Sequence, residues 1–291
     1  MAVYKRSYRA YEGTVTPAWS RVAVIARYAF AEAWASKITI GLFILALLPC
    51  VISLFGIYFA NNPIARGLVG VRSNQPLEVG AGFFMKVLVS QSWLAMILAS
   101  WVAPRMISFD LADNALPILL SHPISRFGYL FGKFLALCVC LSAVTWVPCL
   151  LLFAYQGYTS PDPWAGPNMR IAFGLLAGSI IWIVFLSLLG LALSSWVKWR
   201  VVATGSIFAA MFIPAGVGAI VSAVLRTKWG FLLNLPFIIS LLWRRLLGIP
   251  DETNMRFAIP NGAIVAMLLL VCLACFAMLN KRIRAREVVR G

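Results

Sequence analysis

The stretch ITIGLFILALLPCVISLFGIYFANNPIA, residues 38–65, contains no charged side chain over a length that is sufficient to cross a lipid bilayer. A helix rises about 1.5 Å per residue, so a hydrocarbon layer of roughly 30 Å requires about 20 apolar residues. Further uncharged runs follow it at residues 87–104, 134–161, 171–197, 201–225 and 257–280. The pattern predicts six membrane-spanning helices, placed at residues 38–60, 83–104, 134–155, 171–197, 201–225 and 257–280.

The composition of the whole chain favours a protein embedded in a lipid bilayer. Hydrophobic residues make up 62% of the 291 residues and charged residues only 12%, whereas about 25% charge is usual in soluble domains. The polar segments are short and carry no apolar periodicity of their own. We therefore expect residues 1–291 to form a single all-α integral membrane domain, and because no signal peptide is recognisable, the spans themselves should direct insertion.

The distribution of basic residues predicts the orientation. Lysine and arginine accumulate on the cytoplasmic side of membrane spans. With both termini in the cytoplasm of a cell whose inner or plasma membrane holds the chain, most basic residues lie inside. The cytoplasmic set is then Lys5, Arg6, Arg9, Arg21, Arg27, Lys37, Arg105, Arg126, Lys133, Lys198, Arg200, Lys281, Arg282, Arg284, Arg286 and Arg290. The net charge is +16, and the basic residues lie at span ends rather than on one face. Contact with anionic lipid headgroups explains these positions better than binding of nucleic acid does.

Residues 229–248 do not fit a seventh span. The segment WGFLLNLPFIISLLW, residues 229–243, is uncharged but too short to cross comfortably, and Asn234 and Pro236 interrupt it. A seventh crossing would also move the basic C-terminal tail to the outside. We interpret residues 229–248 as an external re-entrant or interfacial helical pair that breaks at Pro236, with Trp229 and Trp243 at the headgroup level.

The predicted spans lack the side chains that usually couple ions, bind metals or catalyse reactions. We expect no ionisable side chain at membrane depth of the kind that couples secondary transporters. The cysteines lie inside spans without a metal-ligand pattern, and His122 is the only histidine, so no metal site and no catalytic residue is predicted. The chain also has no GxxxxGK[ST] phosphate loop. Any uphill transport would therefore take its energy from another protein.

The most distinctive segment is RMISFDLADNALPILLSHPISRFGYLFGK, residues 105–133, which is predicted to be cytoplasmic yet is rich in apolar side chains. Asp110, Asp113 and Asn114 are suited to cap the start of a short helix, which Pro117 would limit. Ser125 is suited to cap the third span. Such a helix, polar at its tip and apolar behind, fits a cleft on a soluble partner, but packing against the chain's own helices is an equally good reading.

Residues 109–133, FDLADNALPILLSHPISRFGYLFGK, resemble the cytoplasmic segment of ABC-2 type transporter permeases. The chain departs from the commoner family pattern at residues 114–117, where Asn-Ala-Leu-Pro replaces Gly-Thr-Leu-Glu. The matching elements are an acidic residue, a short helix, Leu-Leu, a Pro-Ile-Ser-Arg turn and Gly-Lys. They are Asp110, Asn114, Ala115, Leu116, Leu119, Leu120, Pro123, Ile124, Ser125, Arg126, Gly132 and Lys133.

The resemblance implies six spans, an interfacial helix before the first span, a short coupling helix between spans two and three, and re-entrant helices between spans five and six. Residues 17–36, within the N-terminal region 1–37, fit the interfacial helix, because Trp19, Val22, Ala26, Phe30 and Ala33 recur on one side at helical spacing. An ordinary juxtamembrane linker is the less favoured alternative.

The function implied is that of a permease subunit of an ATP-driven exporter, with no ATPase site of its own. Its partners would be separately encoded ABC ATPase subunits, which hold ATP and Mg²⁺, a second identical or different permease chain, and membrane lipids. The alternative is a membrane scaffold or assembly factor that transports nothing. The residues implied to contact the ATPase are Asp110, Leu111, Asp113, Asn114, Leu116, Leu119, Leu120, His122, Pro123 and Arg126.

Overall fold

The computed structural model describes residues 17–68, 78–112, 125–161, 163–197, 199–250 and 259–284. The regular structure in these ranges is helical. Helices at the six predicted places are long and apolar enough to cross a membrane, which confirms a multi-pass membrane protein. They are Lys37–Asn61, Ala81–Ile107, Arg126–Thr159, Met169–Trp196, Val201–Leu225 and Asn261–Arg282.

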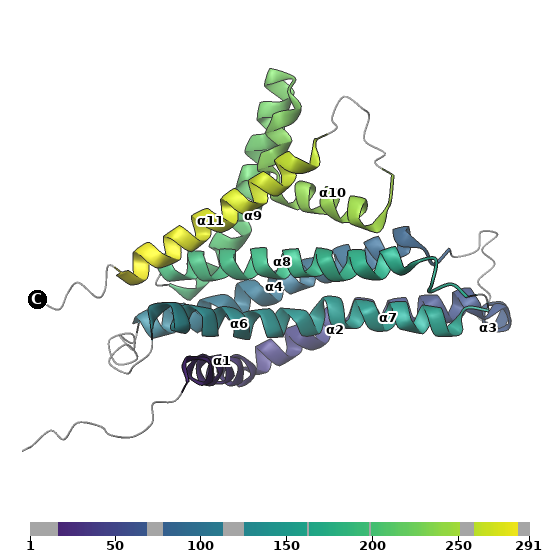
Figure 1. Cartoon of the computed structure of the whole chain (residues 1–291), viewed down its shortest axis with the longest axis horizontal. Helices are drawn as coiled ribbons and strands as arrows, with labels where there is room; N and C mark the ends of the chain where they lie inside the picture. The colour runs from purple at the N-terminus through teal and green to yellow at the C-terminus, as the bar shows by residue number, and fades with distance from the viewer. Residues whose placement is uncertain are drawn as a thin grey trace, which may run out of the picture.

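The centre of the bundle is α8 (Met169–Trp196). In its most apolar stretch 67% of the residues are buried within the chain, against 17% in α2 (Lys37–Asn61). Around α8 pack α4 (Ala81–Ala112), α6 (Arg126–Val144) and α7 (Trp146–Thr159). Figure 1 shows α9 (Arg200–Leu225) and α11 (Asn261–Arg284) leaning away from this bundle. α11 nevertheless contacts α8, so the packed centre of the molecule extends beyond α4, α6, α7 and α8.

The third span is built from two helices in sequence. Thr145 separates α6 from α7, and its hydroxyl donates a hydrogen bond to the carbonyl oxygen of Leu141 at 2.8 Å. Pro148 lies in the first turn of α7, where its missing N–H is tolerated. In Figure 1 α7 continues the direction of α6, so the interruption leaves the course of the span unchanged in this view.

The helix predicted at residues 17–36 is present as α1 (Ala18–Trp34). Figure 1 looks almost down its axis while α6 and α8 run across the view, so α1 crosses the spans. It packs on α6 through buried Ile25, Ala29 and Ala33. Trp19, predicted on the apolar face, is 75% exposed, and its ring meets that of Phe131 on α6 edge to face with centres 6.1 Å apart. The position of α1 at a membrane surface stays a prediction.

Between α9 and α11 the chain forms a short helical pair, as predicted for residues 229–248. The pair consists of the 3₁₀ helix η1 (Lys228–Leu233) and α10 (Leu235–Leu247). The break falls at Asn234, whose side chain accepts a hydrogen bond from Phe237 N at 3.1 Å, while Pro236 lies in the first turn of α10. A short α3 (Pro63–Leu68) follows α2.

The location of α10 corrects the prediction that Trp243 lies at the headgroup level. Trp243 is 4% exposed, and its Nε1–H donates a hydrogen bond to the Gly178 carbonyl oxygen at 3.0 Å. A Cβ atom added at Gly178 would lie 2.7 Å from Trp243 Cδ1, so the glycine makes room for the indole ring. Trp243 is therefore a packing residue between α10 and α8 rather than a headgroup anchor, whereas Trp229 is exposed.

Candidate functional site

The helices flanking the predicted coupling segment, residues 105–133, extend farther into it than the sequence indicated. The second span continues as α4 to Ala112, and α6 begins at Arg126 rather than near residue 134. Asp110 therefore lies in the last turn of α4 and does not cap the start of a short helix. The predicted contact residues Asp113, Asn114, Leu116, Leu119, Leu120, His122 and Pro123, together with the side chain of Leu111, lie outside the described residues.

Three polar side chains connect the two ends of this segment, and we call Asp110, Tyr129 and Lys133 the inner cluster. Lys133 Nζ lies 3.0 Å from Asp110 Oδ2, and the Tyr129 hydroxyl donates a hydrogen bond to the same oxygen at 2.5 Å. Lys133 Nζ is also 5.8 Å from the centre of the Tyr129 ring. The end of α4 is thus tied to the second turn of α6.

Burial makes the inner cluster more than a surface ion pair. The side chains of Lys133 and Asp110 are 7% and 16% exposed, and Tyr129 is 1% exposed. Attraction between charges is much stronger away from water than in it, and a charge left alone there is costly. Lys133 directly precedes the predicted third span, 134–155, and lies within the helix that forms it, where its partner Asp110 allows it to be buried.

The Gly-Lys pair of the motif serves two different neighbours. Lys133 reaches Asp110 on α4, while Gly132 faces α1. A Cβ atom at Gly132 would lie 2.8 Å from Ile25 Cγ2 and 3.2 Å from the Val22 carbonyl oxygen. One turn of α6 therefore contacts both the transverse helix α1 and the end of α4.

The start of α6 agrees with the sequence prediction. Ser125 is its N-cap, and Ser125 Oγ accepts a hydrogen bond from Gly128 N at 3.0 Å. We expect Ser125→Ala to lower the free energy of unfolding by about 1 kcal/mol, the usual effect of losing such a cap. Thermal unfolding in detergent micelles measures this loss. Ser125→Asn preserves an acceptor and should remain close to wild type; equal losses in both variants would contradict the capping role.

Of the predicted contact residues, the structure describes the side chains of Asp110 at the end of α4 and of Arg126 at the start of α6. Arg126 is half-buried in the first turn of α6. The sequence pattern includes Lys133 in the motif and among the basic residues at span ends, but it does not indicate Tyr129 as its neighbour. The spacing of Tyr129 and Lys133, one helical turn apart, was the available signal.

No model of a known protein family and no curated protein matches this chain. The geometry therefore has to be interpreted by itself. An ion pair and a phenol connect two packed helices here. The arrangement is suited to couple the end of α4 to the start of α6.

Proposed function

We propose that this chain is the membrane subunit of an ATP-driven ABC-2 type exporter, driven by separate ATPase subunits that hold ATP and Mg²⁺. Both termini then lie in the cytoplasm, and the chain spans the inner or plasma membrane. The observation that carries the proposal is the inner cluster. It joins α4 and α6 at the base of the segment whose sequence resembles the family's coupling region.

The mechanism needs a contact that differs between two states of the ATPase. Closure of two ATPase subunits would push the residues between α4 and α6. Because Asp110, Tyr129 and Lys133 connect these helices, the push moves them as one unit, and α1 follows through its packing at Gly132. The chain thus works as a mechanical gate whose energy comes from its partner.

A second permease chain completes the proposed unit. The most apolar stretches of α2 and α9 are only 17% and 22% buried within one chain. Helix faces that are left uncovered within one chain can contact either lipids or a second chain in a membrane dimer. Pro214 inside α9 interrupts its backbone hydrogen bonds, which a bilayer tolerates only next to protein or a cavity. We place α9 at the dimer seam or beside the translocation path.

Co-purification tests this proposal directly. The tagged chain is coexpressed with ABC ATPases of its source genome, beginning with genes adjacent to its own, and purified in mild detergent. We expect one ATPase to be retained in a one-to-one ratio and to hydrolyse ATP. Retention of membrane proteins without any nucleotide-binding subunit would support a scaffold instead and would overturn the transporter proposal.

Substitutions in the coupling segment test the mechanism. Arg126→Glu and Leu119→Asp should leave membrane insertion intact but uncouple ATP hydrolysis from transport in reconstituted vesicles, because each alters the proposed ATPase contact. Lys281→Glu makes the same charge change on an exposed residue of α11 and serves as the control. Wild-type transport in both coupling variants would refute the assignment of this segment.

A further inference from the structure

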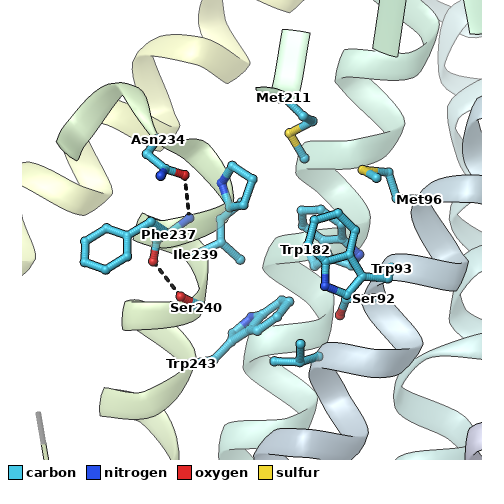
Figure 2. Close-up of a pocket in the computed structure, with 12 residues that line it drawn as sticks. Ser92, Trp93, Met96, Trp182, Met211, Asn234, Phe237, Ile239, Ser240 and Trp243 are labelled. Atoms are coloured by element: carbon cyan, nitrogen blue, oxygen red, sulfur yellow. Dashed lines mark hydrogen bonds between the residues drawn. The ribbon is translucent and has the colours of Figure 1, made fainter. Parts of the chain in front are cut away.

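A cavity that plays no part in the proposed coupling lies between the middle of α4 and the start of α10. Its volume is about 320 Å³. Figure 2 shows Ile239 and Trp243 of α10 on one side and Trp93 and Trp182 on the other. Met96 of α4 and Met211 of α9 close its upper part in this view. We call it the indole cavity, after Trp93, Trp182 and Trp243.

The walls of the indole cavity are suited to flat rings. The rings of Trp182 and Trp243 meet edge to face, with centres 5.8 Å apart and planes at 80°. Trp93 is stacked on Phe212 at 5.8 Å and 7° and is 41% exposed, so it stands where the cavity reaches the outside. Aromatic faces and methionine sulfurs both bind aromatic ligands favourably.

The polar groups of the cavity are few and uncharged. Among the residues that the structure describes, no acidic, basic or histidine side chain lines it. The hydroxyls of Ser92 and Ser240 already donate to the carbonyl oxygens of Leu88 and Phe237, at 2.6 and 2.7 Å. Three donors have no acceptor in the described part of the chain: Asn234 Nδ2, Trp93 Nε1 and the buried Trp182 Nε1. The site therefore disfavours ions and favours a neutral molecule that brings a hydrogen-bond acceptor.

The size of the cavity limits the ligand. An apolar cavity of about 150 Å³ holds one benzene molecule, so about twice that volume admits two or three fused rings. We propose that the indole cavity binds an uncharged molecule with a flat, apolar system of two or three rings and one hydrogen-bond acceptor, such as a ketone oxygen. A flexible acyl chain fits better in the separate groove between α2 and α4, whose walls include aliphatic Leu45, Leu48 and Ile52.

Prodan, a neutral naphthalene ketone whose fluorescence reports its surroundings, is a suitable probe for the purified chain in detergent. We expect saturable binding of one prodan per chain above the linear partitioning into micelles. 2-Acetylnaphthalene should displace it, and 2-naphthoate, which has the same rings but a negative charge, should not. Purely linear partitioning, or equal competition by 2-naphthoate, would overturn the proposal.

Two serines of α4 provide a matched pair of variants. Ser92 lines the indole cavity and Ser90 lines the groove between α2 and α4, and each hydroxyl donates to a carbonyl oxygen of its own helix. Ser92→Phe fills the cavity and should weaken prodan binding at least about tenfold. Ser90→Phe should change it less than about twofold. The reverse order would place the ligand in the other groove and refute the assignment.

Further variants keep the test decisive. Met211→Trp fills the cavity from α9 and replaces Ser92→Phe if that variant does not fold, as judged by gel filtration and circular dichroism. Asn234→Ser retains an oxygen to cap α10 but removes the free amide donor, so it should weaken prodan more than naphthalene, which has no acceptor. These measurements need no ATPase, so their outcome is independent of the proposed transport function.

Discussion

Replacing Lys133 by methionine is expected to lower the free energy of unfolding by about 3 kcal/mol, the low end of the cost of breaking a buried ion pair. Methionine retains the apolar stem of lysine, so the loss reports the charge. Asp110 then stays at 16% exposure with Tyr129 as its described hydrogen-bond partner. The expected loss of free energy lies at the low end because this residual exposure lets water reach part of the carboxylate. Denaturation in mixed micelles measures the loss.

The double variant Asp110→Asn, Lys133→Met provides the control for this prediction. With both charges absent, no unpaired ion remains, and the asparagine oxygen can still accept a hydrogen bond from Tyr129. Most of the lost stability should therefore return. The single variants Lys133→Met and Asp110→Asn are measured beside it. If the double variant loses as much free energy of unfolding as the two single variants lose together, the pair contributes no coupling energy and the inner cluster does not tie α4 to α6.

The six spans follow from sequence because a bilayer imposes a length of apolar chain that few other structures require. Ser125 was predictable as a cap for a similar local reason, since its side chain serves an N–H three residues away. The helical pair at residues 229–248 also followed from local signals, namely a short apolar run with Asn234 and Pro236 at its centre.

Features that depend on distant partners were not predictable in this way. A charged residue marks the end of a span in the sequence, which puts Lys133 outside the predicted third span, whereas Asp110 from α4 allows it to be buried. The preference of indoles for the headgroup region predicts Trp243 as an anchor, but its N–H donates to the carbonyl oxygen of Gly178, 65 residues away in sequence. The indole cavity combines side chains from α4, α8, α9 and α10, and no single run of sequence indicates it.

The second large effect is expected from adding one methyl group at Gly218. This residue of α9 lies against η1 so closely that a new Cβ atom would overlap the carbonyl oxygen of Gly230, and would lie 3.1 Å from Leu233 Cβ. A backbone carbonyl cannot rotate away as a side chain does, so α9 and η1 have to separate. We expect Gly218→Ala to lower the free energy of unfolding by about 3 kcal/mol, the upper end of overpacking costs.

Gly216, two residues earlier on α9, is the matched control because a Cβ atom there meets nothing within 4 Å. Alanine costs less conformational entropy than glycine in a helix, so Gly216→Ala should stabilise the protein by about 0.5 kcal/mol. The two substitutions are chemically identical and differ only in what the methyl group meets, and they should shift the thermal unfolding midpoint in opposite directions. A stabilising Gly218→Ala would show that η1 does not pack directly on the backbone of α9, and the position of the helical pair would have to be revised.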